Sequence, residues 1–225
     1  MPDYRRNRVP GGTFFFTVNL LDRRSDLLVT QIDALRNAVR QVRLRAPFHI
    51  DAWVVLPDHM HWLWTLPEGD ADFPGRWRAI KTAFSKSVPT GEPRSPVMSS
   101  RGERGIWQRR HWEHTIRNDQ DFAAHMEYTH FNSVKHGLVE HPADWSHSSF
   151  RRGVASGLYP AGWLGGSDEP RETGSGGETE MGDKRERAAL AGPCLSRLPP
   201  GLALSGERLA AVRGGMRCAF PPYAR

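Results

Sequence analysis

Cysteine is scarce in this chain of 225 residues, and its two cysteines, Cys194 and Cys218, lie near the C-terminus. Neither belongs to a Cys-x-x-Cys pair, so neither a zinc knuckle nor a disulfide scaffold organises the fold. Long apolar runs are also missing, since the run from Phe14 to Val18 is far shorter than the roughly 20 residues that cross a bilayer. The first residues lack the order of a signal peptide. A cytoplasmic protein is therefore expected, associated with the nucleoid if its partner is DNA.

Acidic residues are outnumbered by basic ones, with 25 Asp and Glu against 31 Lys and Arg and a formal net charge of +6. Most of the cations are arginines, whose planar guanidinium forms forked contacts with phosphate. This balance indicates a polyanionic partner such as a nucleic acid. A solvated basic surface that binds nothing is the alternative that composition leaves open.

The last 62 residues contain no tryptophan and no histidine, but they hold 11 of the 22 glycines. A segment of that composition has too little apolar surface to build a core. We therefore expect one folded domain over residues 1–163. The tail over residues 164–225 is expected to be flexible or disordered, with at most local helix, for example from Glu207 to Val212.

Within the body, the spacing of apolar residues predicts alternating strands and helices. Helices are expected over residues 30–45, 75–87 and 119–136, and a polar loop over residues 89–105. The expected strands are Thr13 to Asn19, Phe48 to Leu56, His59 to Leu66, and Ile106 to Ile116. Pro57 and Asp58 form the turn between the second and third strands. The order βαββαβα predicts an α+β domain in which helices back a small antiparallel sheet.

His59 and His61 are separated by one residue in an expected strand. Because successive side chains of a strand point to opposite faces, both imidazoles lie on the same face and can share a metal ion. The alternative is that one or both are ordinary half-buried strand histidines.

Tyr128 and Asn132 lie four residues apart in the last expected helix, so they occupy one helical face. A phenol with a pKa near ~10 is a poor nucleophile at neutral pH, and a divalent cation would make a phosphodiester easier to attack. Two imidazoles and an amide oxygen form a mixed ligand set that suits Mg²⁺ or Mn²⁺. Alternatively, Tyr128 is a core aromatic residue and Asn132 marks the end of the helix.

Two segments carry a resemblance to a known family. VVLPDHMHWLWTLP (Val54 to Pro67) resembles the His-hydrophobic-His motif of the HUH transposases, and HMEYTHFNSVKHGLV (His125 to Val139) resembles their tyrosine helix. In detail, the chain is similar to the REP-associated tyrosine transposases over roughly residues 4–163. Four further blocks carry this similarity: YRRNRVPGGTFFFTVNL, GRWRAIKTAFS, GIWQRRHWEHTIRNDQDF and DWSHSSFRRGV.

The resemblance implies a ferredoxin-like HUH domain of the single-tyrosine type, in which His59 and His61 bind Mg²⁺ or Mn²⁺ and Asn132 is the third ligand. It also implies that Tyr128 is the nucleophile of a DNA strand transferase that cuts beside imperfect palindromic hairpins through a 5′-phosphotyrosine. The resemblance to the REP-associated group implies a monomer, and a dimer is the alternative, since related transposases include dimers that exchange their tyrosine helices. One departure is Ser133, which stands where the family usually has proline.

Basic and aromatic residues supply candidate DNA contacts. Arginine side chains can neutralise phosphates, aromatic rings can stack on bases, and glycines permit close approach of the backbone. Because alternate residues of a strand face opposite ways, at most half of the cluster from Trp107 to Trp112 can touch DNA. A frayed terminus and a solvated helix face are the alternatives. The candidates are Arg5, Arg6, Arg8, Gly11, Gly12, Arg76, Arg78, Lys81, Trp107, Arg109 and Arg110.

Two other functions stay open at this point. The chain could bind hairpin DNA as a regulatory factor with weak cleavage, or it could be a metal-dependent hydrolase of RNA or DNA in which Tyr128 is structural. A covalent protein–DNA adduct separates the strand transferase from both, because a hydrolase that uses water leaves no adduct.

Overall fold

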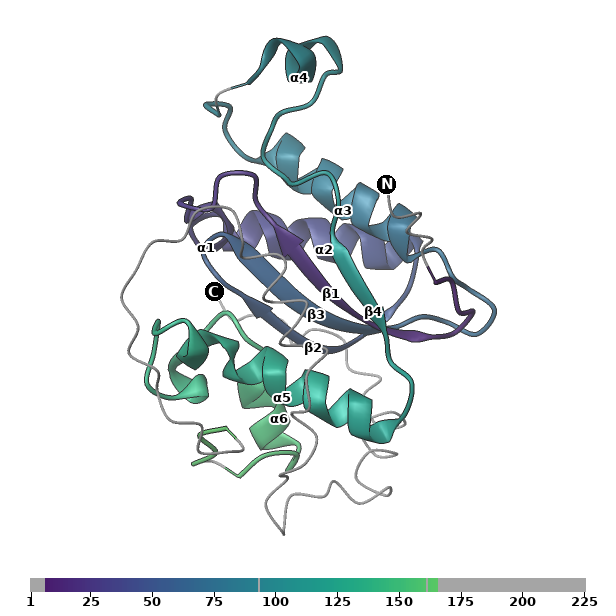
Figure 1. Ribbon diagram of the computed structural model, residues 1–225, viewed down its shortest axis with the longest axis vertical. Coiled ribbons are helices and arrows are strands. Elements are labelled where there is room, and N and C mark those ends of the chain that lie inside the picture. The colour runs from purple at the N-terminus through teal and green to yellow at the C-terminus, as the bar shows by residue number, and fades with distance from the viewer. Residues whose placement is uncertain (1–6, 93, 161, 166–225) are drawn as a thin grey trace, which may run out of the picture.

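A four-stranded antiparallel sheet forms the centre of the computed structural model, which describes residues 7–92, 94–160 and 162–165 (Figure 1). Its strands are β1 (Thr13–Asn19), β2 (His49–Val55), β3 (His59–Thr65) and β4 (Trp112–Thr115), in the order β2-β3-β1-β4. Helices α2 (Ile32–Arg45) and α3 (Phe73–Ser87) connect β1 to β2 and β3 to β4. This βαββαβ arrangement is the ferredoxin-like one, so the α+β prediction is confirmed.

The remaining helices complete two layers around the sheet. They are α1 (Leu27–Thr30), α4 (Pro96–Ser100), α5 (Asp119–Lys135), the 3₁₀ helix η1 (Pro142–Asp144) and α6 (Phe150–Ala155). Figure 1 shows α2 and α3 on one side of the sheet and α5 and α6 on the other. Of the described helices, none is long and apolar enough to cross a membrane.

Strand β1 shows why the sheet is covered on both faces. Phe14 and Phe16 point toward α2 and α3, whereas Phe15 points toward α5, and all three rings are fully buried. A run of consecutive aromatic residues is stable in a strand only when both faces are shielded from water. The sheet therefore separates two cores of different composition.

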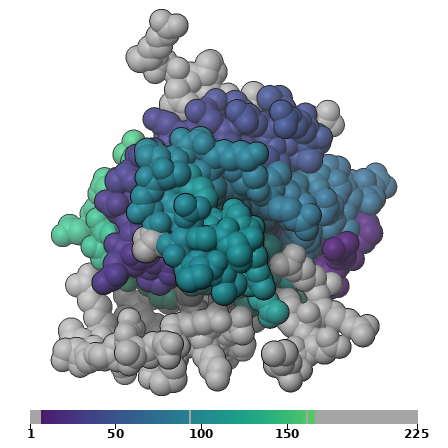
Figure 2. Space-filling model, turned by 90° about the horizontal axis from the view of Figure 1, so that it is seen from above, coloured from purple at the N-terminus to yellow at the C-terminus, as the bar shows by residue number. Residues whose placement is uncertain are grey.

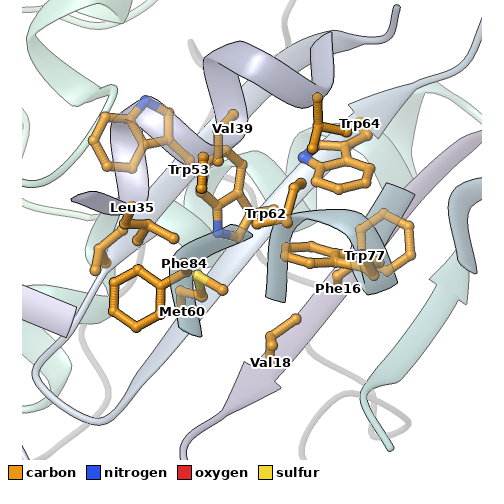
Figure 3. Packing of buried hydrophobic residues seen from close by; sticks show 14 of the residues in the cluster. Phe16, Val18, Leu35, Val39, Trp53, Met60, Trp62, Trp64, Trp77 and Phe84 are labelled. Atoms are coloured by element: carbon orange, nitrogen blue, oxygen red, sulfur yellow. The ribbon is translucent and has the colours of Figure 1, made fainter. Parts of the chain in front are cut away.

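The core on the α2 and α3 side is almost entirely aromatic and aliphatic (Figure 3). Trp64 on β3 stacks on Trp77 of α3 with ring centroids 4.3 Å apart, and Phe16 meets Trp77 edge-on at 5.5 Å. This face carries the bulk of the apolar burial that holds the sheet together. The opposite face of β3 is consequently free to carry polar side chains.

The region from residue 89 to 116 differs from the prediction in two ways. The expected polar loop contains α4, which Ser95 caps by accepting a hydrogen bond from the Met98 amide. Figure 1 shows α4 at the end of a segment that projects beyond α3, and Figure 2 looks down onto that projection.

The expected strand from Ile106 to Ile116 is interrupted, because Trp112–Thr115 forms the regular ladder with β1 whereas Trp107 forms an isolated bridge with Leu20. The His111 ring turns into the aromatic core, 6.0 Å from Trp77, so the chain leaves the ladder there. Helices α1, η1 and α6 were not predicted from the sequence.

Candidate functional site

His59 and His61 lie on β3, on the face of the sheet that α5 covers. Their rings are 2% and 0% exposed, and the ring centroids are 5.1 Å apart. Strand β3 lies between β2 and β1, so its backbone is paired on both sides and the positions of the two imidazoles are rigidly set. The shared face that the His-x-His spacing predicts is therefore present.

Each imidazole has its Nδ1 atom held by an oxygen. Asp58 Oδ1 accepts a hydrogen bond from His59 Nδ1 at 2.7 Å, and Thr17 Oγ1 lies 3.0 Å from His61 Nδ1. Within the described part of the chain, the Nε2 atom of each ring is buried and has no hydrogen-bond partner. An oxygen on one ring nitrogen and a free lone pair on the other is the usual arrangement of a metal-binding histidine.

Helix α5 brings Tyr128 and Asn132 to the same place. Asn118 caps this helix by accepting a hydrogen bond from the Asp121 amide. The Tyr128 ring meets His61 edge-on, with centroids 5.2 Å apart. One turn later, Asn132 is fully buried, and its amide nitrogen and oxygen have no partner among the described residues. An unpaired buried polar group costs about 1–3 kcal/mol, so these orphaned atoms favour a ligand. The Asn132 amide oxygen and the two imidazole Nε2 atoms together fit a divalent cation.

His136 belongs to this cluster and was missed from the sequence. Its ring centroid lies 4.9 Å from that of His59. Tyr128, Asn132 and His136 are spaced by four residues, so they lie along one face of the helix. Tyr128 contacts His61 and His136 contacts His59, and Asn132 lies between them on the helix. Extending the four-residue spacing by one step beyond Asn132 would have found His136.

Burial keeps two of these imidazoles neutral. It lowers the pKa of His61 well below the usual value, and the nearby charges of His59 and His136 lower it further. Burial, followed by the charge of His59, also lowers the pKa of His136 to about 4. A neutral imidazole is the form that binds metal ions.

The candidate DNA contacts fall into several environments. Arg5 and Arg6 lie outside the described residues, whereas Arg8, Arg109 and Arg110 are exposed. Arg109 forms an ion pair with Glu103 at 3.1 Å.

Lys81 and Trp107 are half-buried and meet each other. Lys81 donates a hydrogen bond to the Gln108 carbonyl at 2.9 Å, and its ammonium nitrogen lies 5.5 Å from the centroid of the Trp107 ring. Trp107 donates a hydrogen bond to Ser85 at 3.1 Å. Both side chains are therefore already part of the contact between α3 and the segment that precedes β4.

Gly11 and Gly12 form the turn that leads into β1. Gly11 has a φ of 68°, a conformation that residues with a side chain rarely adopt. The amide of Gly11 donates to the Asp70 carbonyl and that of Gly12 to the Val9 carbonyl, so both donors are used inside the protein. The structure thus gives both glycines a local folding role, and a role in DNA contact stays a prediction.

Arg76 requires a correction, because the structure places it inside the protein. Its side chain is 4% exposed, and its guanidinium donates to both carboxylate oxygens of Asp70 and to the carbonyls of Ala46, Pro47 and Asp72. These bonds join α3 to the end of α2. Because the guanidinium nitrogens already donate hydrogen bonds inside the protein, they cannot also form a forked contact with a phosphate. We therefore assign Arg76 a structural role in place of the expected DNA contact.

Arg76→Ala should therefore lower the free energy of unfolding by about 2–4 kcal/mol, because it leaves Asp70 and three carbonyls without their donor. Urea unfolding would measure this loss. Arg78→Ala is the matched control, since Arg78 is exposed on the same helix and its loss should change stability by less than about 0.5 kcal/mol. Hairpin affinity, measured below the unfolding temperature, should fall for Arg78→Ala and not for Arg76→Ala. The reverse pattern would restore Arg76 as a DNA contact.

His130 is another buried histidine, and it joins α5 to residues near the C-terminal end of the described fold. His130 Nε2 lies 2.7 Å from Ser149 Oγ, and its Nδ1 lies 3.0 Å from the Tyr159 hydroxyl. Burial, with a smaller effect of the Arg152 charge, lowers the pKa of His130 to about 3. The folded protein therefore holds this ring in its neutral form.

This burial predicts loss of stability on mild acidification. Between pH 6.5 and 3 the unfolded chain binds a proton at His130 that the folded chain does not, so stability falls as the pH falls through that window. Between pH 6.5 and 5 the group should contribute a loss of about 1–2 kcal/mol. Urea unfolding at both pH values would show a shallower decline for His130→Gln than for the wild type. Parallel declines would show that His130 is not responsible.

The chain is similar to known proteins. A REP-associated tyrosine transposase of Escherichia coli (strain K12) is 51% identical over 165 residues, which cover 73% of this chain and 92% of that protein. A relative from Haemophilus influenzae is 43% identical over 170 residues, covering 75% of this chain and 96% of the relative. No family model matches the chain.

A solved structure is also similar. It is described as the REP-associated tyrosine transposase bound to a REP hairpin, and it superposes with a TM-score of 0.65 and 47% sequence identity. The match covers 80% of this chain and all of that one. The ferredoxin-like sheet, the His-x-His pair on β3 and the facing tyrosine on α5 define a transposase of the single-tyrosine HUH class. Within that class, the chain belongs to the REP-associated tyrosine transposases.

Proposed function

We propose that this protein is a metal-dependent endonuclease and strand transferase that cuts single-stranded DNA beside REP-like hairpins through a 5′-phosphotyrosine at Tyr128. The observation that carries the proposal is the contact of Tyr128 with His61, one of two adjacent buried imidazoles whose Nε2 atoms have no hydrogen-bond partner among the described residues. Such a set has the parts that a tyrosine needs to attack a phosphodiester.

The protein's own residues would position the reacting groups. The Tyr128 oxygen attacks the phosphorus, the bond from phosphorus to the 3′ oxygen breaks, and the departing strand keeps a 3′ hydroxyl. Asp58 and Thr17 orient the rings of His59 and His61. A Mg²⁺ or Mn²⁺ ion bound by His59, His61 and Asn132 would draw electron density from the phosphate and stabilise the leaving oxygen. Because one phosphodiester replaces another, the strand can be rejoined without ATP.

Lys135 supports the same chemistry from the outer side of the tyrosine. Its ammonium nitrogen lies 5.0 Å from the centroid of the Tyr128 ring. A cation over the ring attracts a phosphate toward the nucleophile and favours negative charge on the phenol oxygen. The side chain therefore suits the approach of a DNA backbone to Tyr128.

Hairpin DNA is the proposed partner because the solved relative is described as bound to a REP hairpin. The exposed Arg8, Arg109 and Arg110 would contact phosphates, consistent with the positive net charge of +6. A monomer would be sufficient, since Tyr128 meets His61 of the same chain. With this substrate we expect the protein to act in the cytoplasm, at the nucleoid.

The test is to trap the covalent product. The full chain would be incubated with Mn²⁺ and a labelled single-stranded hairpin from the repeats that flank its gene, and denaturing gels would be searched for labelled protein. Peptide mapping should locate the nucleotide on Tyr128, and EDTA should abolish the adduct. If the protein shifts the hairpin but forms no adduct, the alternative of a hairpin-binding regulatory factor replaces this proposal. Cleavage without an adduct would point to a hydrolase.

A further inference from the structure

Three further metal-binding side chains meet on the other side of Phe15 from the HUH histidines. His114 lies on β4, and Asp121 and His125 lie in the first two turns of α5. Each offers one ligand atom, and these atoms all lie within 4.8 Å of one another. Nothing in the proposed cleavage reaction uses this cluster.

The distances between the three side chains match those around one cation. His114 Nε2 lies 2.9 Å from Asp121 Oδ2, and His125 Nδ1 lies 3.0 Å from Asp121 Oδ1. Ligands at roughly 2.0–2.1 Å from a tetrahedral Zn²⁺ are about 3.3 Å from each other, so these atoms are close enough to share one ion. Binding would replace the hydrogen bonds that the two rings now form with Asp121, including the one from His125 Nδ1 to the Asp121 carbonyl at 2.8 Å. The two imidazole rings are stacked, 14° apart with centroids separated by 4.6 Å, so one ring would turn to bring its in-plane lone pair onto an ion shared with the other.

The burial of His125 is the second observation. Its side chain is 8% exposed, and its Nδ1 atom is the nitrogen that faces Asp121, whereas its Nε2 atom is buried without a hydrogen-bond partner among the described residues. The ion would therefore bind Nδ1. Burial also lowers the pKa of His125, which favours the neutral imidazole that binds metals. In contrast, the side chains of His114 and Asp121 are about one-fifth exposed, so an ion can enter from solvent.

We propose that His114, Asp121 and His125 form a second cation site, separate from the HUH pair, that binds Zn²⁺ or a similar first-row divalent ion. Two imidazoles and one carboxylate are the ligands such ions prefer, with a fourth position for water. The site would join β4 to the start of α5.

An ion bound by His114, Asp121 and His125 would hold α5, the helix that carries Tyr128, against β4. His125 precedes Tyr128 by three residues, so the two lie on neighbouring positions of α5. The Phe15 ring lies 4.8 Å from the His125 ring and 5.5 Å from the His61 ring. Phe15 therefore separates the two sites while touching a ligand of each.

The experiment measures how many Zn²⁺ ions the full, untagged chain binds. Cys194 and Cys218 would first be changed to serine, since they are the other soft ligands in the sequence. In that background, His59→Ala/His61→Ala removes the HUH pair, and equilibrium dialysis followed by metal analysis should still find about one Zn²⁺ per chain. Adding His114→Gln or Asp121→Asn should weaken this binding at least tenfold. The exposed His141→Gln is the matched control and should leave it unchanged.

Loss of all Zn²⁺ binding in the His59→Ala/His61→Ala protein, or binding that is indifferent to His114→Gln and Asp121→Asn, would overturn the proposal and leave a metal-free hydrogen-bonded cluster. Crystals of the wild-type chain grown with Zn²⁺ give an independent readout that does not depend on variants. An anomalous difference peak should lie between His114, Asp121 and His125. A peak only at His59 and His61 would refute the second site and leave the proposed cleavage reaction untouched.

Discussion

Tyr128→Phe is expected to lower DNA cleavage by roughly 10³-fold or more and to eliminate the covalent adduct. The substitution removes one oxygen and keeps the ring that packs against His61 and Phe15. Hairpin affinity should therefore stay within about twofold, because that ring packing holds α5 in place without the hydroxyl. Labelled-hairpin cleavage on denaturing gels and a binding titration on the same preparation would measure both quantities.

Tyr159→Phe is the matched control. Tyr159 is buried on the same side of the sheet, and its hydroxyl lies 3.0 Å from His130 Nδ1. Removal of the Tyr159 hydroxyl should lower the free energy of unfolding by about 1 kcal/mol and leave cleavage and the adduct intact. If Tyr128→Phe retained the adduct, or if both variants lost cleavage equally, Tyr128 would not be the nucleophile and its place against His61 would be structural.

His61→Ala is expected to lower metal-dependent cleavage by at least about 10²-fold, because even residues that only orient a metal ligand contribute 10- to 100-fold. His61 is fully buried against Tyr128 of α5, and its Nε2 atom has no hydrogen-bond partner among the described residues. Mn²⁺ affinity, measured by calorimetry, should fall in parallel with the cleavage rate. Cleavage that persists in His61→Ala with unchanged dependence on Mn²⁺ would rule out this pair as the metal site.

The control for this prediction uses the other end of the same hairpin. His49 pairs with Thr65 in the register of β2 and β3, far along the strand from His61, and its Nδ1 atom lies 3.0 Å from Asp51 Oδ1. His49→Ala should leave Mn²⁺ affinity unchanged. Thr17→Val should give an intermediate loss of about 10- to 100-fold, since it removes only the partner of His61 Nδ1.

Much of the fold could be predicted because the signals are local. The bounds of β1 agree with the expected strand, and β3 begins at His59 as expected, directly after the Pro57-Asp58 turn. Side chains alternate every residue in a strand and repeat about every fourth residue in a helix. The common faces of His59 with His61 and of Tyr128 with Asn132 follow from these periods alone.

The environment of charged and polar side chains could not be predicted in the same way. Arg76 and Arg78 look alike in the sequence, yet one is buried and the other exposed. A clue was available, since Arg76 precedes the buried Ile80 by one helical turn. However, an arginine is buried only where carbonyls and a carboxylate meet it, and Ala46, Pro47 and Asp70 come from other segments. No local pattern predicts that meeting.

By itself, the sequence determined the residues available for chemistry, the alternation that puts both histidines on one face, and the family to which they belong. Only the tertiary structure decided that α5 crosses β3 so that Tyr128 meets His61, that His136 joins His59, and that His114 meets Asp121 and His125. The physical reason is that local periodicity sets the direction of a side chain, whereas contacts between distant segments depend on how both faces of the sheet pack. An aromatic and aliphatic core on one face left the other face of β3 for polar groups and for the helix that carries the tyrosine.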